Sequence, residues 1–377
     1  MKRSAAVVLA SAASLAPAQI QLIEPAPGYT RAIVTALSTD GTTLAINLSN
    51  ADGGGVDAFT YSGGLWHALA RYGSNNRVIS MSDDGRATLT VSHDAYQGLN
   101  QLVYERDGIR TLMPPNPDEF PTRGTLSRDG LTAAFTIQAG TTDPHNMFFQ
   151  WSDAGLATLP VNTGPDYTVQ SILGSDRDDF LVLTGYGQSN PGNQSRVSVY
   201  DAGQLTQIQP LAGDFFSLQS SAVAVTTGDR RIIGYDAFRA GPGQDLSFRS
   251  WIHADGTTTQ IRADGVDDLH VLSASDDAHL MVAQGIVGGS IDWFLLGADG
   301  SLDPVTDLLA AHGLLLTDTQ HASLSMISGD GTLLVGQITD RVPGISISYT
   351  TFTLRIPTPG TLAPAALAGL LAMRRRR

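Results

Sequence analysis

A short motif, Ser-x-Asp-Gly followed by an alternating apolar segment, recurs along almost the whole chain. Clear copies begin at Ser38, Ser82, Ser127 and Ser328, and degenerate copies lie at residues 174–176, 227–229 and 275–277. One aspartate marks each copy, at intervals of 44 to 54 residues: Asp40, Asp84, Asp129, Asp176, Asp229, Asp276 and Asp330. A period of this length is typical of supersecondary units that bury their faces against each other.

Each repeat has the same order of strand and turn signals. An alternating apolar segment such as Leu44, Ile46 and Leu48 follows the motif and predicts a strand. After a variable loop comes an aromatic-rich strand, and then a second tight turn such as Arg106-Asp107-Gly108. Asp-Gly between apolar alternations favours a hairpin. We therefore expect four antiparallel strands in each repeat.

The last repeat lacks its fourth strand, and the N-terminal part of the chain can supply it. Residues 20–25 (IQLIEP) resemble residues 205–210 (LTQIQP), which follow the second turn of their own repeat. We expect Ile20–Glu24 to pair beside Tyr349–Leu354 and so to remove exposed strand edges. The sequence predicts an all-β fold, a seven-bladed β-propeller of four-stranded antiparallel blades over residues 19–356, closed by the N-terminal strand.

Composition limits the chemistry. The chain has 377 residues, a net charge of −13 and no cysteine, which excludes disulfides and thiolate catalysis. Lys2, Arg3 and the four terminal arginines are the only charged residues of the two ends, so the remaining body is more acidic still. Such a surface repels phosphate backbones and argues against a nucleic-acid partner.

Residues 1–18 are typical of a secretory signal peptide. Lys2 and Arg3 precede a short apolar segment, and Ala16-Pro17-Ala18 fits an A-x-A cleavage site whose recognition residues are Ala16 and Ala18. The apolar segment is shorter than the roughly 20 residues that a membrane-spanning helix needs. We expect signal peptidase to process this end and the protein to be exported.

Residues 357–377 are typical of a second targeting signal, at the other end of the sequence. Pro357-Thr358-Pro359-Gly360 precedes an apolar stretch that ends at Met373, and Arg374, Arg375, Arg376 and Arg377 follow. This order resembles the PEP-CTERM sorting signal of Gram-negative-type bacteria. The resemblance implies recognition by exosortase, a membrane protease, and delivery to the cell envelope, outer surface or extracellular matrix. A plain membrane anchor, transient or permanent, is the alternative. Residues 325–337 are also similar to HAF-type extracellular repeats.

No catalytic or metal-binding pattern stands out. The sequence has no nucleophile elbow, no zinc-protease motif and no phosphate-binding glycine loop. Eight scattered histidines lack metal-site spacing. Asn50, Asp52 and Asp57 are weak calcium candidates on one glycine-rich loop, without the full spacing of a calcium loop. Arg230 beside Asp229 is expected to form a surface ion pair.

These observations lead us to predict a non-catalytic binding or scaffold protein without a cofactor, whose partner is an extracellular protein or polysaccharide. Two alternatives stay open. One is a polysaccharide-active hydrolase or lyase that uses aspartates facing the propeller axis, and the other is a calcium-dependent adhesion module. An enzyme would gather aspartates, arginines or histidines at one mouth of the axis, whereas a scaffold would have a featureless mouth.

Overall fold

The computed structural model describes residues 19–356 except 51–54, 70, 72, 74, 95–98, 114–118, 140–144, 162–166, 175–179, 188–194, 212–216, 242 and 342–346. The predicted signal peptide, with Ala16 and Ala18, and the predicted sorting tail, with Pro357 to Gly360 and Arg374 to Arg377, lie outside the described residues, as does Asp52.

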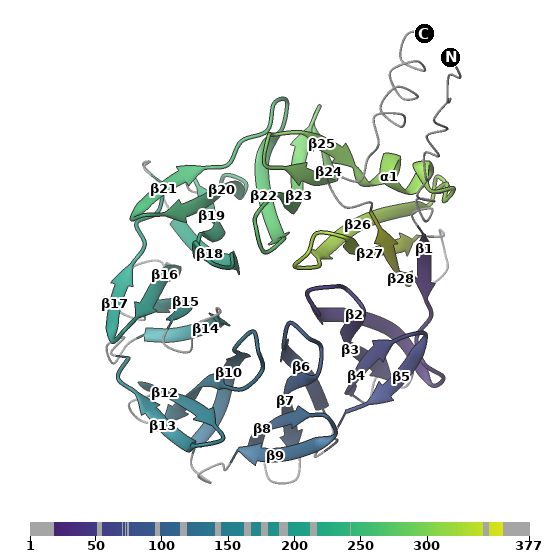
Figure 1. Cartoon of the computed structure of the whole chain (residues 1–377). Coiled ribbons are helices and arrows are strands. Elements are labelled where there is room, and N and C mark those ends of the chain that lie inside the picture. Colours follow the sequence, from purple (N-terminus) through teal and green to yellow (C-terminus); the bar gives the residue numbers. More distant parts are fainter. Residues whose placement is uncertain are drawn as a thin grey trace, which may run out of the picture.

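The fold is built from antiparallel sheets that stand radially around one axis (Figure 1). Eight strands form one connected set: β2 (Tyr29–Leu37), β3 (Thr43–Asn50), β4 (Val56–Ser62), β5 (Leu65–Ala68), β6 (Asn75–Met81), β7 (Ala87–Asp94), β8 (Leu99–Arg106) and β9 (Ile109–Met113). Only the parallel bridge between Val56 and Asn75 joins its two halves.

Four-stranded sheets follow along the chain. The first two are β10 (Glu119–Leu126), β11 (Ala133–Ala139), β12 (His145–Ser152) and β13 (Gly155–Leu159), and then β14 (Tyr167–Gly174), β15 (Phe180–Gly187), β16 (Ser195–Asp201) and β17 (Gln204–Gln207). The next two are β18 (Ser217–Val225), β19 (Ile232–Arg239), β20 (Ser247–Ala254) and β21 (Thr257–Gln260), and then β22 (Asp267–Ala274), β23 (Leu280–Val287), β24 (Ser290–Gly297) and β25 (Leu302–Pro304).

The last sheet combines both ends of the described chain. It holds β26 (Gln320–Ile327), β27 (Leu333–Asp340), β28 (Ser348–Arg355) and β1 (Ile20–Ile23), in the order β1-β28-β27-β26. Ile20 pairs with Leu354 and Ile23 with Thr351. The expected pairing of the N-terminal strand with the strand near Tyr349–Leu354 is therefore confirmed.

Buried side chains fill the space between neighbouring sheets. In β3, Leu44, Ile46 and Leu48 pack against Ile23 and Val335 of the last sheet. The opposite face of β3 packs toward β6, where Asn47 accepts a hydrogen bond from the Val78 N–H over 2.9 Å. Both faces of β3 are therefore covered. Alternate residues of the strand point into two different packed interfaces, rather than into the core and into solvent.

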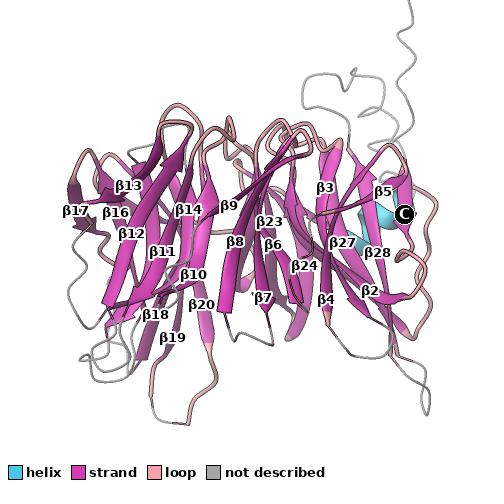
Figure 2. Ribbon diagram, turned by 90° about the horizontal axis from the view of Figure 1, so that it is seen from below, coloured by secondary structure: helices cyan, strands magenta, loops and turns pink. Residues whose placement is uncertain are grey.

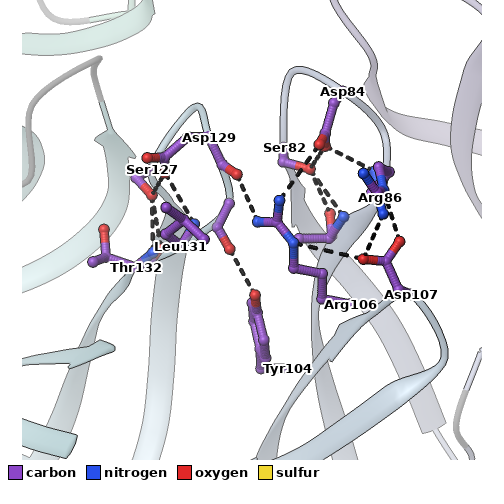
Figure 3. Close-up of polar contacts among 12 residues, drawn as sticks. Ser82, Asp84, Arg86, Tyr104, Arg106, Asp107, Ser127, Asp129, Leu131 and Thr132 are labelled. Carbon is purple, nitrogen blue, oxygen red and sulfur yellow. Dashed lines mark hydrogen bonds and ion pairs between the residues drawn. The ribbon is translucent and has the colours of Figure 1, made fainter. Parts of the chain in front are cut away.

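The repeated motif forms one turn with a fixed hydrogen-bond pattern between the first and second strands of a sheet. The Ser82 hydroxyl donates to Asp84 Oδ1 over 2.6 Å and accepts from the Ala87 N–H over 2.9 Å. Ser127 and Asp129 repeat this arrangement (Figure 3). Burial alone would raise the pKa of Asp84, but hydrogen bonds from Ser82 and Arg86 and the nearby arginine charges outweigh it, and the net shift is downward.

The turns and loops lie at the two ends of the strands (Figure 2). The single helix among the described residues, α1 (Val305–Ala311), follows β25 and was not expected from the sequence. Val305 and Leu309, four residues apart, are both buried against the last sheet, which explains the helix at this point. No helix in the described ranges has the length and apolar character needed to cross a bilayer.

Candidate active site at the central axis

The second residue of each motif turn borders the axis, and backbone hydrogen bonds connect these residues from sheet to sheet. The Thr39 N–H donates to the Asp83 carbonyl, and the Asp83 N–H donates to the Arg128 carbonyl, each over 2.8 Å. On the other side, Thr227 donates to Asp276 over 2.9 Å and Asp276 to Gly329 over 2.8 Å. The turn at residues 175–179 lies outside the described residues. The turns hold each other in place around one mouth of the axis.

Arg128 extends across this mouth. Its Nη1 lies 2.7 Å from a carboxylate oxygen of Asp276 and 3.3 Å from one of Asp83. Its Nη2 donates to the Val225 carbonyl over 2.9 Å. One guanidinium therefore connects the β6–β7 and β22–β23 turns with the end of β18, and it brings two carboxylates together.

The two carboxylates differ in environment. The Asp276 side chain is 23% exposed and makes the shorter contact with Arg128, whereas the Asp83 side chain is 42% exposed. Burial raises the pKa of Asp83, the Arg128 charge opposes this, Asp276 adds to it, and the net shift is upward. Burial would lower the pKa of Arg128, but its bonds to Asp276 and Asp83 dominate and the net shift is upward. Arg128 therefore stays charged, while the surroundings of Asp83 favour its protonated form more than water would.

A cavity of about 240 Å³ lies behind this mouth on the axis. Asp83 and Asp276 line one part of it, and the inner strands supply apolar walls with a few hydroxyls: Leu37, Ile79, Met81, Met326, Thr35, Ser80 and Thr125. The mouth and its cavity therefore combine carboxylates and hydroxyls with apolar side chains, the kind of mixed lining in which a few polar groups orient a small ligand.

The calcium candidates do not assemble at this mouth. Asn50 ends β3, and Asp57 lies in β4, where it accepts a hydrogen bond from the Tyr29 hydroxyl over 2.9 Å and pairs with Arg71 over 3.4 Å. Across the described residues, no three His, Asp or Glu side chains are grouped closely enough to hold a metal ion.

The sequence analysis named no catalytic residue, and the structure separates two roles within the motif. The marker aspartates Asp40, Asp84, Asp129 and Asp330 form hydrogen bonds within their own turns. In the copy at residues 275–277 this structural role belongs to Asp277, while Asp276 occupies the second position and faces the axis. The missed signal is the variable second residue, which is charged in only three described copies: Asp83, Arg128 and Asp276.

No sequence model of a protein family matches the chain, and no curated protein matches it in sequence. Solved structures do match in fold. An oligogalacturonate lyase in complex with manganese has a TM-score of 0.57 at 10% identity, covering 91% of this chain and 97% of that one. The fold is a β-propeller.

Other solved structures match over similar lengths. An oligogalacturonate lyase from Vibrio parahaemolyticus has a TM-score of 0.55 at 9% identity, covering 91% of this chain and 98% of that one. The β-propeller domain of the Trilobed protease from Pyrococcus furiosus, which has an open velcro topology, gives 0.52 at 11% identity, covering 86% and 94%. At these identities the likeness concerns the fold.

One expectation needs correction. The sequence led us to predict a non-catalytic protein, but the similar structures over nine-tenths of the chain include lyases, which are enzymes. The mouth of the axis is not featureless either, since it holds two carboxylates and an arginine. The prediction failed because it searched for motifs that are contiguous in sequence, whereas these groups come from three separate repeats.

Proposed function

We propose that this protein is a polysaccharide-active enzyme, and that its reacting groups lie at the axis mouth spanned by Arg128. The observation that carries the proposal is one arginine nitrogen within 3.3 Å of two carboxylates above a cavity. In this arrangement Asp83, the more exposed carboxylate, is the proton-transfer group, and Asp276 holds Arg128 in position.

A lyase acting on a uronic-acid polymer fits these groups best. The Arg128 guanidinium would bind the sugar carboxylate in place of Asp83 and stabilise the negative charge that develops on it. Asp83 would take the proton next to that carboxylate. The electron pair of the broken C–H bond then forms the new C=C bond. The glycosidic C–O bond breaks, its electron pair stays on the leaving oxygen, and this oxygen takes a proton from solvent water as the other part of the chain is released.

A hydrolase is the second candidate, supported by the spacing of the carboxylates. The Asp83 and Asp276 oxygens lie 3.3 Å and 2.7 Å from the same nitrogen, so their separation cannot exceed the sum of these distances. This upper limit on the distance between the two nearest oxygens is compatible with the roughly 5–5.5 Å between the carboxyl groups of retaining glycosidases.

The two reactions are told apart by their products. Purified protein is incubated with polygalacturonate, alginate and a neutral glucan while ultraviolet absorbance of unsaturated sugars and release of reducing ends are followed. A lyase produces both signals from a uronate polymer, whereas a hydrolase produces reducing ends alone. We expect Asp83→Asn to lower kcat by roughly 10²–10⁴-fold. The control Asp318→Asn, an exposed aspartate, should leave it unchanged. Absence of both signals on all substrates, or full activity of Asp83→Asn, would overturn the proposal.

We count seven blades in the propeller, because β2–β5 and β6–β9 share only one bridge and otherwise form two four-stranded sheets. In this count β1 completes the seventh blade beside β28. An experimental structure with a different number of sheets around the axis would contradict it.

We further propose that the protein is exported and sorted through its two ends. Signal peptidase would cleave after Ala18, and an exosortase-type protease would act at Pro357-Thr358-Pro359-Gly360. Mass spectrometry of the protein from its native host should then find an N-terminus at Gln19 and no arginine cluster.

Calcium-dependent adhesion would instead require calcium to raise the melting temperature through the loop of Asn50, Asp52 and Asp57.

A further inference from the structure

A second site lies away from the axis, in a groove of about 960 Å³ between β17 and the β20–β21 hairpin. We call it the β17 groove. Comparison with the equivalent interface between two other sheets shows why the β17 groove is open. Between β8 and β12 the space is filled by Tyr104 and Trp151, whose ring centroids are 4.6 Å apart.

At the filled interface, polar contacts close the remaining gap. The Tyr104 hydroxyl donates to the Gly130 carbonyl over 2.7 Å, and Arg106 Nη1 donates to the Asp129 carbonyl over 2.7 Å. Figure 3 shows Tyr104 and Arg106 reaching from one sheet toward the turn of the next. At this interface, aromatic and polar side chains thus connect the two sheets directly.

Strand register identifies the equivalent positions at the β17 groove. Asp201 pairs with Gln204 where the β16–β17 hairpin closes, as Arg106 pairs with Ile109 in the β8–β9 hairpin. Val199 therefore holds the position of Tyr104, and Asp201 that of Arg106. Val199 and Asp201 both line the groove.

The facing sheet differs as well. Ala254 pairs with Thr257 as Ser152 pairs with Gly155, so His253 holds the position of Trp151. A valine and a histidine thus replace the tyrosine and tryptophan, and the lost ring volume becomes the groove.

The motif turn beside the groove is rearranged too. The Thr226 backbone N–H donates to the Arg231 carbonyl, just as the Ser127 backbone N–H donates to the Thr132 carbonyl in the β10–β11 turn. Asp229 therefore occupies the position that Gly130 has in that turn. Arg230 then takes a left-handed conformation with φ of 52°, and Asp229 pairs with Arg231 over 2.6 Å. A non-glycine residue in this region is uncommon and is often associated with function.

The lining identifies the ligand chemistry. Burial lowers the pKa of His253, so its ring is neutral near pH 7, and its Nδ1 lies 3.0 Å from the Thr258 hydroxyl. Exposed hydroxyl and amide groups of Gln204, Thr206 and Thr257 surround it. The lining residues also include three carboxylates, Asp201, Asp229 and Asp255, against the guanidinium of Arg230, so acceptors for sugar hydroxyls predominate and the net charge of these groups repels anions.

We propose that the β17 groove binds a neutral oligosaccharide, at a site separate from the axis mouth. The carboxylates and the amides match sugar hydroxyls, and the buried side chains of Phe180 and Ile208 give the groove an apolar floor. This binding does not depend on the reaction proposed for Asp83.

The test restores the filled interface. The double variant Val199→Tyr with His253→Trp copies the Tyr104–Trp151 pair and should fold with an unchanged or higher melting temperature. Cellohexaose and maltohexaose, each titrated by calorimetry, serve as neutral probes, with trigalacturonate as the acidic one. We expect at least one neutral probe to bind the wild type and the double variant to lose at least tenfold in affinity. Val199→Ile, which keeps the groove open, should bind as the wild type does.

Asp83→Asn separates this inference from the proposed enzymatic function. It should leave the Kd of the neutral probe unchanged even where it abolishes turnover. Failure of both neutral probes to bind the wild type, equal binding by the folded double variant, or tighter binding of trigalacturonate in the groove would each overturn the inference.

Discussion

Arg128 Nη1 lies 2.7 Å from the Asp276 carboxylate, although the two residues belong to sheets that are not neighbours along the chain. The contact crosses the mouth of the axis, as does the hydrogen bond from Arg128 Nη2 to the Val225 carbonyl. Arg128 is only 17% exposed, so water screens this ion pair less than a surface pair. It therefore restrains the ring as a whole as well as shaping the candidate active site.

The first prediction concerns this pair. Arg128→Met should reduce the free energy of unfolding by about 1–3 kcal/mol, less than the roughly 3–5 kcal/mol of a fully buried pair, because it leaves Asp276 without its cation. A double-mutant cycle with Asp276→Asn in urea should show clear coupling. The cycle with Asp83→Asn should show less, because that contact is longer and more exposed. Equal coupling in both cycles would contradict this account.

The second prediction concerns the N-terminal strand. Ile23 is 1% exposed and packs with Leu44, Leu48 and Val335, so Ile23→Ala should lower stability by about 2–5 kcal/mol. Leu22, its neighbour in the same strand, is 48% exposed, and Leu22→Ala should change stability little. Thermal unfolding of both variants measures the difference. Similar losses would mean that β1 is not packed as described.

The third prediction concerns a glycine beneath an aromatic ring. A Cβ at Gly336 would overlap the Phe352 ring and the Ser323 carbonyl, so Gly336→Ala should destabilise the last sheet by roughly 1–3 kcal/mol. A Cβ at Gly241 meets Gln244 no closer than 3.6 Å, so Gly241→Ala serves as the control. Denaturant midpoints of the two variants should separate clearly, and a neutral Gly336→Ala would show that the ring can move aside.

The fourth prediction is a pH dependence. His270 stacks on Phe248 at 4.4 Å and contacts Tyr235 at 4.2 Å, and burial lowers its pKa from 6.5 to about 4. Between these values the unfolded chain binds a proton that the folded chain does not, so this residue's contribution to stability falls as the pH falls through that window. Allowing for partial exposure, the loss should be roughly 1–2 kcal/mol.

The variant His270→Phe tests this pH dependence, since a phenylalanine ring keeps the packing against Phe248 and Tyr235 and cannot titrate. Unfolding measured at about pH 7.5 and about pH 4.5 should show a smaller acid loss for the variant than for the wild type. An identical pH dependence would place the titrating group elsewhere.

The sequence by itself determined the repeat. Strand alternation and Asp-Gly turns are local signals, so the four-strand order was readable from one copy, and the resemblance of residues 20–25 to residues 205–210 located β1. The sequence did not predict helix α1, because this helix depends on the burial of Val305 and Leu309 against the neighbouring sheet.

The candidate sites were decided by the tertiary structure. Asp83, Arg128 and Asp276 occupy the same variable position in three repeats, and nothing local distinguishes them from solvated turn residues. They become a site only because the closed arrangement directs that position toward one axis, where charges from distant repeats meet. The β17 groove likewise exists because Val199 and His253 face each other across two sheets, a relationship that strand pairing and packing create.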